Sequence, residues 1–200
     1  MSIRILGKPR SPWGDYGDVL IHGMTSHLSR TVDGRLQLER TAPFVPPISF
    51  PGISDLVVTD ECKRKLENSK LVGFSFRTVS KARIVESTWH NWDLNSESPA
   101  EYPESGEPED YILMREHSPI LESSIGEIWE VLLTESAKTE RSVQEERRWD
   151  DPIYLLMNSW TGADLFRASN VGYIYASEQA QKWFNETYPD YVRFSDCLIK

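Results

Sequence analysis

The sequence predicts an α+β fold with a mixed or antiparallel sheet, in a single domain that covers residues 1–200. Two similar strand–helix–strand motifs, over 54–81 and 172–199, are the main support for this fold class. A hairpin signal near the N-terminus adds strands that belong to neither motif. This mixture of strands and helices is typical of α+β domains, and 200 residues lie within the size range of one domain.

The first element along the chain is a predicted β-hairpin over residues 18–40. Two apolar runs, around Ile21 and Leu38, flank Asp33-Gly34. Both turn residues tolerate positive φ, which the tight turns of hairpins require. We therefore expect two antiparallel strands joined at this turn.

The next segment, 41–52, is expected to cross the surface as an extended, polyproline-like chain. Proline has no backbone N–H and a fixed φ, so it disrupts helices and central strands. Four prolines fall in this segment: Pro43, Pro46, Pro47 and Pro51.

The first strand–helix–strand motif follows. An apolar strand at 56–58 leads to Thr59, a residue type that caps helix N-termini, and two acids in the first turn suit the helix dipole. The predicted helix runs to about Ser69, and an alternating strand follows at 74–76.

Adding 118 to these residue numbers, without a gap, gives the same order of elements in the second motif, with Ser177 as the cap. The apolar helix face keeps its four-residue spacing, with Cys62 and Leu66 in the first motif and Ala180 and Phe184 in the second. Two alternatives remain. The gapless offset favours a structural duplication, but unrelated strand–helix–strand motifs are also common in α+β domains.

The remaining segments are assigned more coarsely. A strand continues at 82–86, a buried strand is predicted at 154–157, and a turn is predicted within 160–168. Residues 125–133 fit either a helix or a strand, and 140–151, dense in both charges, fit a solvated helix or loop.

Residues 93–110, here called the acidic loop, form the most distinctive segment. The loop contains no lysine or arginine, and its prolines and Gly106 prevent regular structure, so we expect a long exposed loop or a partly disordered insertion. It is either a solvated insertion that only aids solubility or a binding surface for a cationic partner. Its seven acids are Asp93, Glu97, Glu101, Glu104, Glu107, Glu109 and Asp110.

Three aromatic residues are candidates for contact with a partner. Trp89 and Trp92 come just before the acidic loop, and Tyr102 lies within it. Large aromatic residues are common in cores and also among the residues that dominate interface energies. The two tryptophans are therefore interpreted either as core anchors or as interface residues.

The sequence shows no motif for phosphate binding, metal-dependent hydrolysis or a nucleophilic serine. His22 and His27 fall in the predicted hairpin, where an odd spacing points them to opposite faces, so they would not share a metal. We therefore predict no metal and no cofactor.

Cys62 and two pairs of carboxylates are the remaining candidates for catalysis. A thiol in the first helical turn can be activated, but the second motif has alanine at the same place, which indicates a small core residue. Glu145-Glu146 and Asp150-Asp151 flank two arginines, which indicates surface ion pairs. The sequence therefore does not predict an enzyme.

The charge balance limits the class of partner. Twenty-two basic and 31 acidic residues give a formal net charge of −9, which would repel phosphates. We expect neither a nucleic acid nor a membrane as partner, whereas a basic protein is compatible. With two cysteines, no signal-peptide pattern and no apolar run of 18 residues, the expected location is the cytoplasm.

Several segments resemble bacterial immunity proteins of polymorphic and contact-dependent, type VI-like toxin systems. They are 38–47 (LERTAPFVPP), 56–60 (LVVTD), 89–93 (WHNWD), 164–167 (DLFR) and the closing strand–helix–strand segment 175–194. The double Cys-x-x-Cys of one branch of these families is absent, so neither that branch nor its metal is expected.

The resemblance implies a non-enzymatic antitoxin that binds a cognate toxin domain and protects the cell in bacterial competition. On this hypothesis the acidic loop attracts a basic toxin domain, and charge reversal of Glu101, Glu104 and Glu107 is expected to slow association. The alternatives are a cytoplasmic enzyme that uses Cys62 or a histidine, and an adaptor unrelated to toxins. The predicted partner-binding residues are Trp89, Trp92, Glu97, Glu101, Tyr102, Glu104, Glu107, Glu109 and Asp110.

Overall fold

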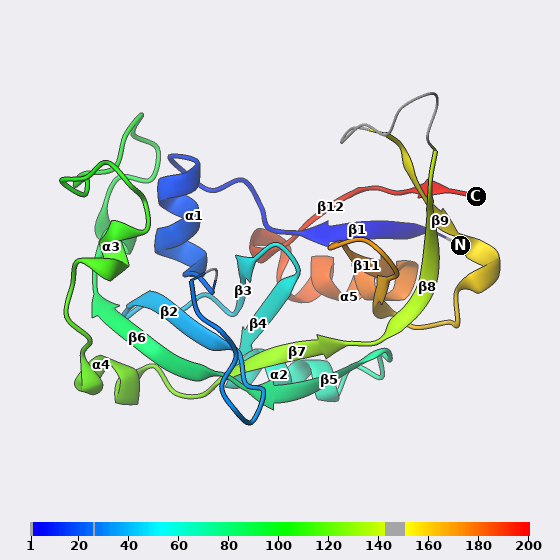
Figure 1. Cartoon of the computed structure of the whole chain (residues 1–200), viewed down its shortest axis with the longest axis horizontal. Helices are drawn as coiled ribbons and strands as arrows, with labels where there is room; N and C mark the ends of the chain where they lie inside the picture. Colours follow the sequence, from blue (N-terminus) through cyan, green and yellow to red (C-terminus); the bar gives the residue numbers. More distant parts are fainter. Residues whose placement is uncertain (1, 26, 143–150) are drawn as a thin grey trace. The chain divides into compact units, whose positions relative to one another are not determined.

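The computed structural model describes residues 2–25, 27–142 and 151–200 (Figure 1). The chain forms two compact units, which we call the terminal unit (Met1–Gly7, Leu66–Ser75 and Leu132–Lys200) and the central unit (Lys8–Lys65 and Phe76–Val131). Both contain helices and strands in antiparallel and mixed pairing, which confirms the predicted α+β class. The single domain expected over 1–200 stays a prediction.

The central unit contains a four-stranded sheet and a separate pair of parallel strands. The sheet has the order β3-β4-β7-β5, and β5 and β7 contribute residues to both units. Helix α1 (Asp15–His22) packs on β2 and β3, α3 (Asp110–Leu113) on β2 and β6, and α4 (Pro119–Ser124) on β6. The strands are β3 Ile48–Gly52, β4 Asp55–Thr59, β5 Phe74–Thr78 and β7 Ile128–Leu133 in the sheet, and β2 Gln37–Ala42 and β6 Ser80–Glu86 in the pair.

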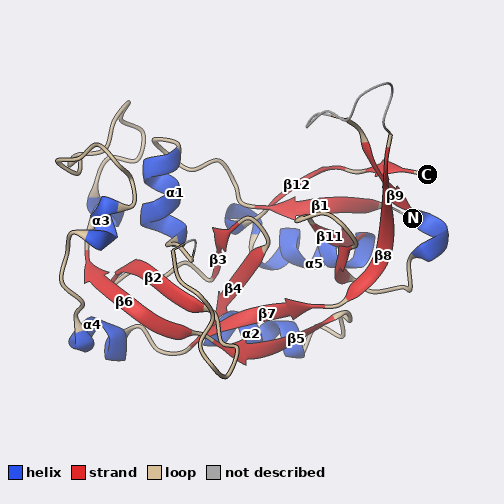
Figure 2. Ribbon diagram, in the orientation of Figure 1, coloured by secondary structure: helices blue, strands red, loops and turns tan. Residues whose placement is uncertain are grey.

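The terminal unit contains a seven-stranded sheet of order β12-β1-β11-β10-β8-β9-β13. Helix α5 (Glu178–Thr187) packs on β11 and β1 (Figure 2). The core includes Phe166 and Tyr175, whose rings stack with centroids 5.4 Å apart. The strands are β1 Ile3–Gly7, β8 Glu135–Arg141, β9 Ile153–Leu156, β10 Leu165–Ala168, β11 Ile174–Ser177, β12 Arg193–Asp196 and β13 Leu198–Ile199, with 3-10 turns η2 Met157–Ser159 and η3 Pro189–Tyr191.

Both predicted strand–helix–strand motifs are present. The first consists of β4, α2 (Asp60–Glu67) and β5, and the second of β11, α5 and β12. The caps are those predicted: Thr59 Oγ1 accepts the N–H of Cys62 at 3.4 Å, and Ser177 Oγ accepts the N–H of Ala180 at 3.2 Å. The four-residue spacing buries the helix faces, because none of these core residues is more than 1% exposed: Cys62, Leu66, Ala180 and Phe184.

The two motifs also share a topology. In the first, β7 lies between β4 and β5, and β3 flanks β4; in the second, β1 lies between β11 and β12, and β10 flanks β11. The flanking strand is antiparallel to its neighbour in both cases. Each motif is therefore a split β-α-β arrangement with one inserted strand, and this common order favours the duplication over unrelated motifs. The inserted strands, β7 and β1, come from different places in the chain, and the 118-residue offset does not relate one to the other.

The predicted hairpin over 18–40 is wrong in its first half, which forms helix α1 and not a strand. The apolar residues that suggested a strand also fit a helical spacing. Tyr16 and Leu20 lie four residues apart and pack in the same apolar cluster. The second half does form strand β2, but β2 pairs in parallel with β6. The predicted turn at Asp33-Gly34 is confirmed, with Gly34 at a φ of +82°.

The segment 41–52 is not the surface segment that the sequence predicts. Thr41 is buried in β2, and Ile48, Ser49 and Phe50 are buried in β3. Because β3 is an edge strand of its sheet, Pro51 can lie in it without removing a hydrogen bond from a central strand. The prolines exclude a helix and a central strand, but they do not exclude a buried edge strand.

The coarser assignments are confirmed in part. Strands form at 82–86 within β6 and at 154–156 within β9, and the ambiguous 125–133 contains strand β7. Gly162 has a φ of +92° in the predicted turn, after which β10 forms a strand that was not expected. Strand β8 occupies the start of 140–151, whereas Glu145, Glu146 and Asp150 lie outside the described residues.

Candidate functional site

The acidic loop lies within the central unit, between the 3-10 turn η1 (Trp89–Asn91) and helix α3, and it runs beside α1 (Figures 1 and 2). Residues 92–109 form neither helix nor strand, so the predicted loop is confirmed. Five of its seven acidic residues are exposed, while Glu109 and Asp110 are partly buried.

Four aromatic side chains under the loop form a cluster that we call the aromatic support: Trp13, Tyr16, Trp92 and Tyr111. The ring centroids of Trp13 and Trp92 are 5.8 Å apart. Those of Tyr111 lie 6.2 Å from Tyr16 and 6.4 Å from Trp92. These separations are in the range of favourable aromatic pairs. The support joins the start of α1 to both ends of the acidic loop.

Two members of the support also hold the backbone of the loop by hydrogen bonds. The Tyr16 hydroxyl donates to the carbonyl oxygen of Gly106 at 2.6 Å. The indole N–H of Trp13 donates to the carbonyl oxygen of Ser96 at 3.1 Å. Both contacts fix a loop residue relative to helix α1.

Tyr111 provides a third attachment, because its hydroxyl donates to the carbonyl oxygen of Glu101. Burial, with the neighbouring hydroxyls of Tyr102 and Tyr16, raises the pKa of Tyr111 to about 12. The hydroxyl therefore keeps its proton at neutral pH and remains a donor.

The negative charge of the loop is mostly not neutralised within the described residues. Arg115 pairs with Glu101 at 3.3 Å, and no other loop carboxylate forms a salt bridge within 2–25, 27–142 and 151–200. Asp110 accepts a hydrogen bond from Ser105 Oγ at 2.5 Å, and Asp93 accepts one from the N–H of Asn95 at 3.0 Å. These neutral donors orient the carboxylates without cancelling their charge.

Tyr102, whose surface is 55% exposed, borders two hollows in the central unit. The smaller, which we call the Met114 hollow, has a volume of about 340 Å³. The larger, which we call the Trp13 hollow, includes Arg10, Leu94 and Glu97. The Met114 hollow is lined by Tyr102, Pro103, Glu104, Ser105, Asp110, Tyr111, Met114 and Arg115.

The three aromatic residues predicted to contact a partner differ in how far they are exposed. Trp89 is only 4% exposed, and its indole N–H donates to Thr41 Oγ1 at 3.0 Å, so it is a core anchor and cannot offer contact area to a partner. Trp92 is half-buried in the aromatic support. Tyr102 alone of these three is largely exposed.

Two of the residues considered for catalysis, Cys62 and His22, are buried. Cys62 is completely buried in the core, which confirms its predicted place and keeps its thiol from a substrate. His22 ends α1 and was wrongly placed in a strand; its Nδ1 accepts the N–H of Phe50 at 3.3 Å, and burial lowers its pKa to about 4. The described residues contain no group of three potential metal ligands and no helix long and apolar enough to cross a membrane.

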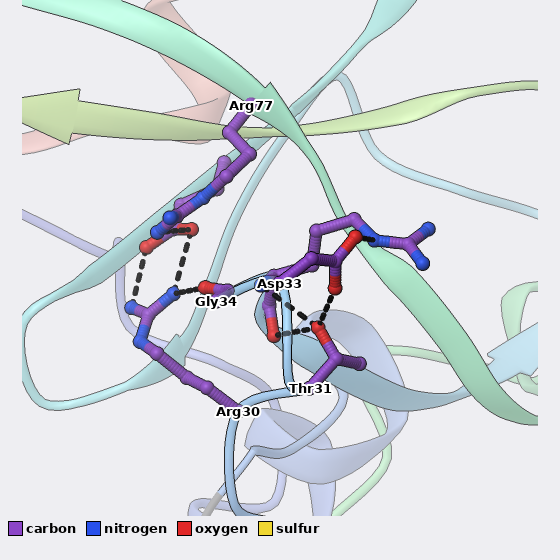
Figure 3. Close-up of polar contacts among 7 residues, drawn as sticks. Arg30, Thr31, Asp33, Gly34 and Arg77 are labelled. Atoms are coloured by element: carbon purple, nitrogen blue, oxygen red, sulfur yellow. Dashed lines mark hydrogen bonds and ion pairs between the residues drawn. The ribbon is translucent and has the colours of Figure 1, made fainter.

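A second polar cluster surrounds Glu130, a residue that no sequence motif marks; its two arginine partners, Arg30 and Arg77, are labelled in Figure 3. This carboxylate accepts hydrogen bonds from Arg30 at 2.9 and 2.6 Å and from Arg77 at 3.1 Å. Burial by itself raises the pKa of Glu130, but the bonds from both arginines outweigh it, so the pKa lies below its ordinary value. The cluster ties a loop to β7 and β5, and the long sequence separations left no local signal for it.

No family model matches the chain, and no curated protein matches it.

Proposed function

We propose that this chain is an immunity protein that binds a cognate bacterial toxin domain with a basic surface and thereby blocks the toxin. One observation carries the proposal. The acidic loop presents carboxylates that are mostly without ion pairs in the described residues, and the aromatic support holds them in place beside exposed Tyr102.

The charge of the loop suits a protein partner that is itself positive. A surface of one sign raises the rate of encounter with a partner of the opposite sign. A toxin that acts on nucleic acid needs a basic cleft for phosphates, and an acidic loop that occupies such a cleft would exclude the substrate. The proposed mechanism is therefore steric and electrostatic blockade, with no chemical step.

The attachment of the loop suits tight binding. A segment that is disordered before binding must lose conformational entropy in the complex, which weakens affinity. Hydrogen bonds from Trp13, Tyr16 and Tyr111 to the loop backbone reduce this loss, because the loop is already held. Preorganisation of this kind favours a binding surface over an insertion that only aids solubility.

Growth rescue tests the proposal. The larger protein encoded beside this chain's gene is expressed in a bacterial cytoplasm, where it is expected to arrest growth, and co-expression of this chain is expected to restore it. A variant with Glu97→Lys, Glu104→Lys and Glu107→Lys is expected to rescue poorly. All three side chains are exposed and form no salt bridge with described residues.

A matched control separates the loop from total charge. Glu127→Lys, Glu135→Lys and Asp190→Lys change the net charge by the same amount at exposed positions outside the loop. This control is expected to rescue like the unchanged chain. If the unchanged chain neither restores growth nor binds the neighbouring protein, or if control and loop variants rescue equally, the proposal is wrong.

A further inference from the structure

We propose that the Met114 hollow receives one arginine side chain of the bound partner. This inference rests on the proposed function, because it identifies the group through which a basic protein would anchor to the acidic loop. Its support comes from the walls of the hollow, from its carboxylates and from an arginine that the chain already holds there.

The walls of the hollow provide apolar surface for the stem of a long side chain. Met114 is 79% exposed and Tyr102 is 55% exposed, although both are large apolar or aromatic residues. Tyr111, only 2% exposed, closes the hollow against the core. An aliphatic stem laid between these groups would remove their apolar surface from water, which is favourable.

Two carboxylates in the same hollow provide acceptors for a cationic head. Glu104 and Asp110 both line it, and neither forms a salt bridge within the described part of the chain. Ser105 Oγ donates to Oδ2 of Asp110 at 2.5 Å, which orients this carboxylate and leaves Oδ1 without a hydrogen bond to any described residue. A guanidinium, with five N–H donors, can bond to more than one carboxylate oxygen.

Arg115 shows that the hollow is compatible with a guanidinium. Its Cζ lies 6.0 Å from the centroid of the Tyr111 ring. Two of its N–H groups are used, one by Glu101 Oε2 at 3.3 Å and one by the carbonyl oxygen of Glu86 at 3.1 Å. Arg115 pairs with Glu101 and forms no salt bridge with Glu104 or Asp110, so their negative charge remains for a second cation.

The chemistry favours arginine over lysine, and this hollow over the Trp13 hollow. A planar guanidinium stacks on an aromatic ring and donates in a fork, whereas an ammonium is a strongly hydrated point charge. The lining of the Trp13 hollow has one carboxylate, Glu97, and one cation, Arg10. The Met114 hollow has two carboxylates, Glu104 and Asp110, and its one cation, Arg115, is already paired with Glu101. The assignment is therefore to the Met114 hollow alone.

Methionine-methyl NMR of the whole chain tests the assignment without the toxin. The chain has four methionines, so a ¹³C-methyl-methionine sample gives few signals, and Met114 reports on the hollow while buried Met24 reports on the core. The probes are the capped tripeptides Gly-Arg-Gly, Gly-Lys-Gly and Gly-citrulline-Gly. The arginine peptide is expected to shift the Met114 signal with saturation at on the order of millimolar concentration, as befits so small a ligand.

Two variants test the carboxylates. Glu104→Gln and Asp110→Asn are each expected to weaken arginine-peptide binding by about two- to fivefold, the range for a partly exposed ion pair. An unchanged Met24 signal shows that each variant is folded. Glu127→Gln, outside the hollow, is expected to leave the titration unchanged.

Three outcomes would overturn the inference: no shift of Met114, an equal response to the citrulline peptide, which lacks the charge, or an equal response to the lysine peptide. If the chain rescues growth but the arginine peptide does not shift Met114, only the proposed arginine site is wrong. Failure of rescue with a positive titration removes the toxin proposal and leaves the arginine site in place.

Discussion

Arg40 shows how a single buried charge can connect two elements. This fully buried residue donates to the carbonyl oxygens of Thr41 at 3.0 Å, Ile21 at 3.2 Å and Phe44 at 3.4 Å. Burial lowers its pKa to about 10, so it remains charged at neutral pH. Because Ile21 lies in the last turn of α1, the charge also suits the negative end of the helix dipole. Arg40 thus fixes the C-terminal end of α1 to β2.

His22 is expected to make the stability of the chain depend on pH. Its pKa is lowered from 6.5 to about 4, mainly by burial, against the attraction of Asp18 and with the repulsion of Lys8 and Arg40. Below pH 6.5 the unfolded state takes up a proton that the folded state does not, so stability falls as the pH drops toward 4. The loss attributable to His22 is about 3 kcal/mol.

Urea unfolding of the unchanged chain and of His22→Asn between pH 7 and pH 4 measures this contribution. Asparagine keeps an acceptor for the N–H of Phe50 but does not titrate. The stability difference between the two proteins is expected to shift in favour of the variant as the pH falls below 6.5. A difference independent of pH would show that His22 is not held neutral.

Glu130 is expected to be a sensitive position because its side chain is only 3% exposed and is bonded by two arginines. Glu130→Gln should lower the free energy of unfolding by about 1.5–3 kcal/mol, the range for hydrogen bonds to charged groups. The folded pKa is lowered, so the contribution of the carboxylate is present above pH 4.5 and is lost as the pH falls through the folded pKa.

Denaturant unfolding at pH 7 measures the effect, with Arg35→Gln as the comparison. Arg35 pairs with Asp33 on the surface, where both side chains are exposed, and its loss should cost below about 1 kcal/mol. An equal loss of stability in both variants would mean that the Glu130 cluster contributes no more to the free energy of unfolding than a surface ion pair does.

At the scale of elements, the acidic loop is expected to control the rate of association. The variant with lysine at Glu97, Glu104 and Glu107 should bind the cognate toxin domain at least about tenfold more slowly at low salt, because it weakens long-range attraction. The dissociation rate should change less. Stopped-flow or surface-based kinetics at several salt concentrations provides the measurement.

The comparison is again with lysine at Glu127, Glu135 and Asp190. This control alters the same number of charges but not the loop. If it slows association as much as the loop variant does, then total charge matters and the position of the loop does not. The rate for the unchanged chain should also fall with added salt.

The two motif helices are expected to depend on the same buried positions. Leu66→Ala should cost about 2–5 kcal/mol and Phe184→Ala about 3–5 kcal/mol, since both side chains are at most 1% exposed. Cys62→Ala should cost less, because the matching position in the second motif is Ala180. Thermal and urea unfolding of the three variants gives the order. A larger loss for Cys62→Ala than for Leu66→Ala would contradict the correspondence of the motifs.

At the scale of the whole molecule, a net charge of −9 does not identify a binding surface. Several acids are used internally, such as Glu130 with its two arginines and Glu39 with Arg83. The acidic loop differs because Glu101 is its only acid in a salt bridge among described residues. The functional proposal therefore depends on where charge is left unpaired and not on its total.

Features of the fold that depend on neighbouring residues were predictable from the sequence, and features that depend on distant residues were not. The caps at Thr59 and Ser177 and the buried four-residue spacing were predictable, because a cap and a helix face are set by residues within one or two turns. Helix α1 was missed, because a short apolar run fits both periods and its packing against β2 and β3 decided the outcome.

The same holds for the candidate site. Proline, glycine and like-charged residues in one segment were enough to predict an exposed acidic loop. Its attachment was not predictable, since Trp13 and Tyr16 lie 83 and 90 residues from the loop positions that they hold. The burial of Trp89, which removed it from the proposed contact surface, also depended on distant residues.

Local sequence patterns were sufficient to specify the α+β class, both strand–helix–strand motifs and the composition of the acidic loop, because propensity, capping and charge act over short stretches of chain. The common order of the inserted strands, the pairing around Glu130 and the attachment of the acidic loop to Trp13 and Tyr16 became visible only in the folded chain. Each of these needs residues that are brought together from distant positions, and such contacts leave no mark on the local sequence.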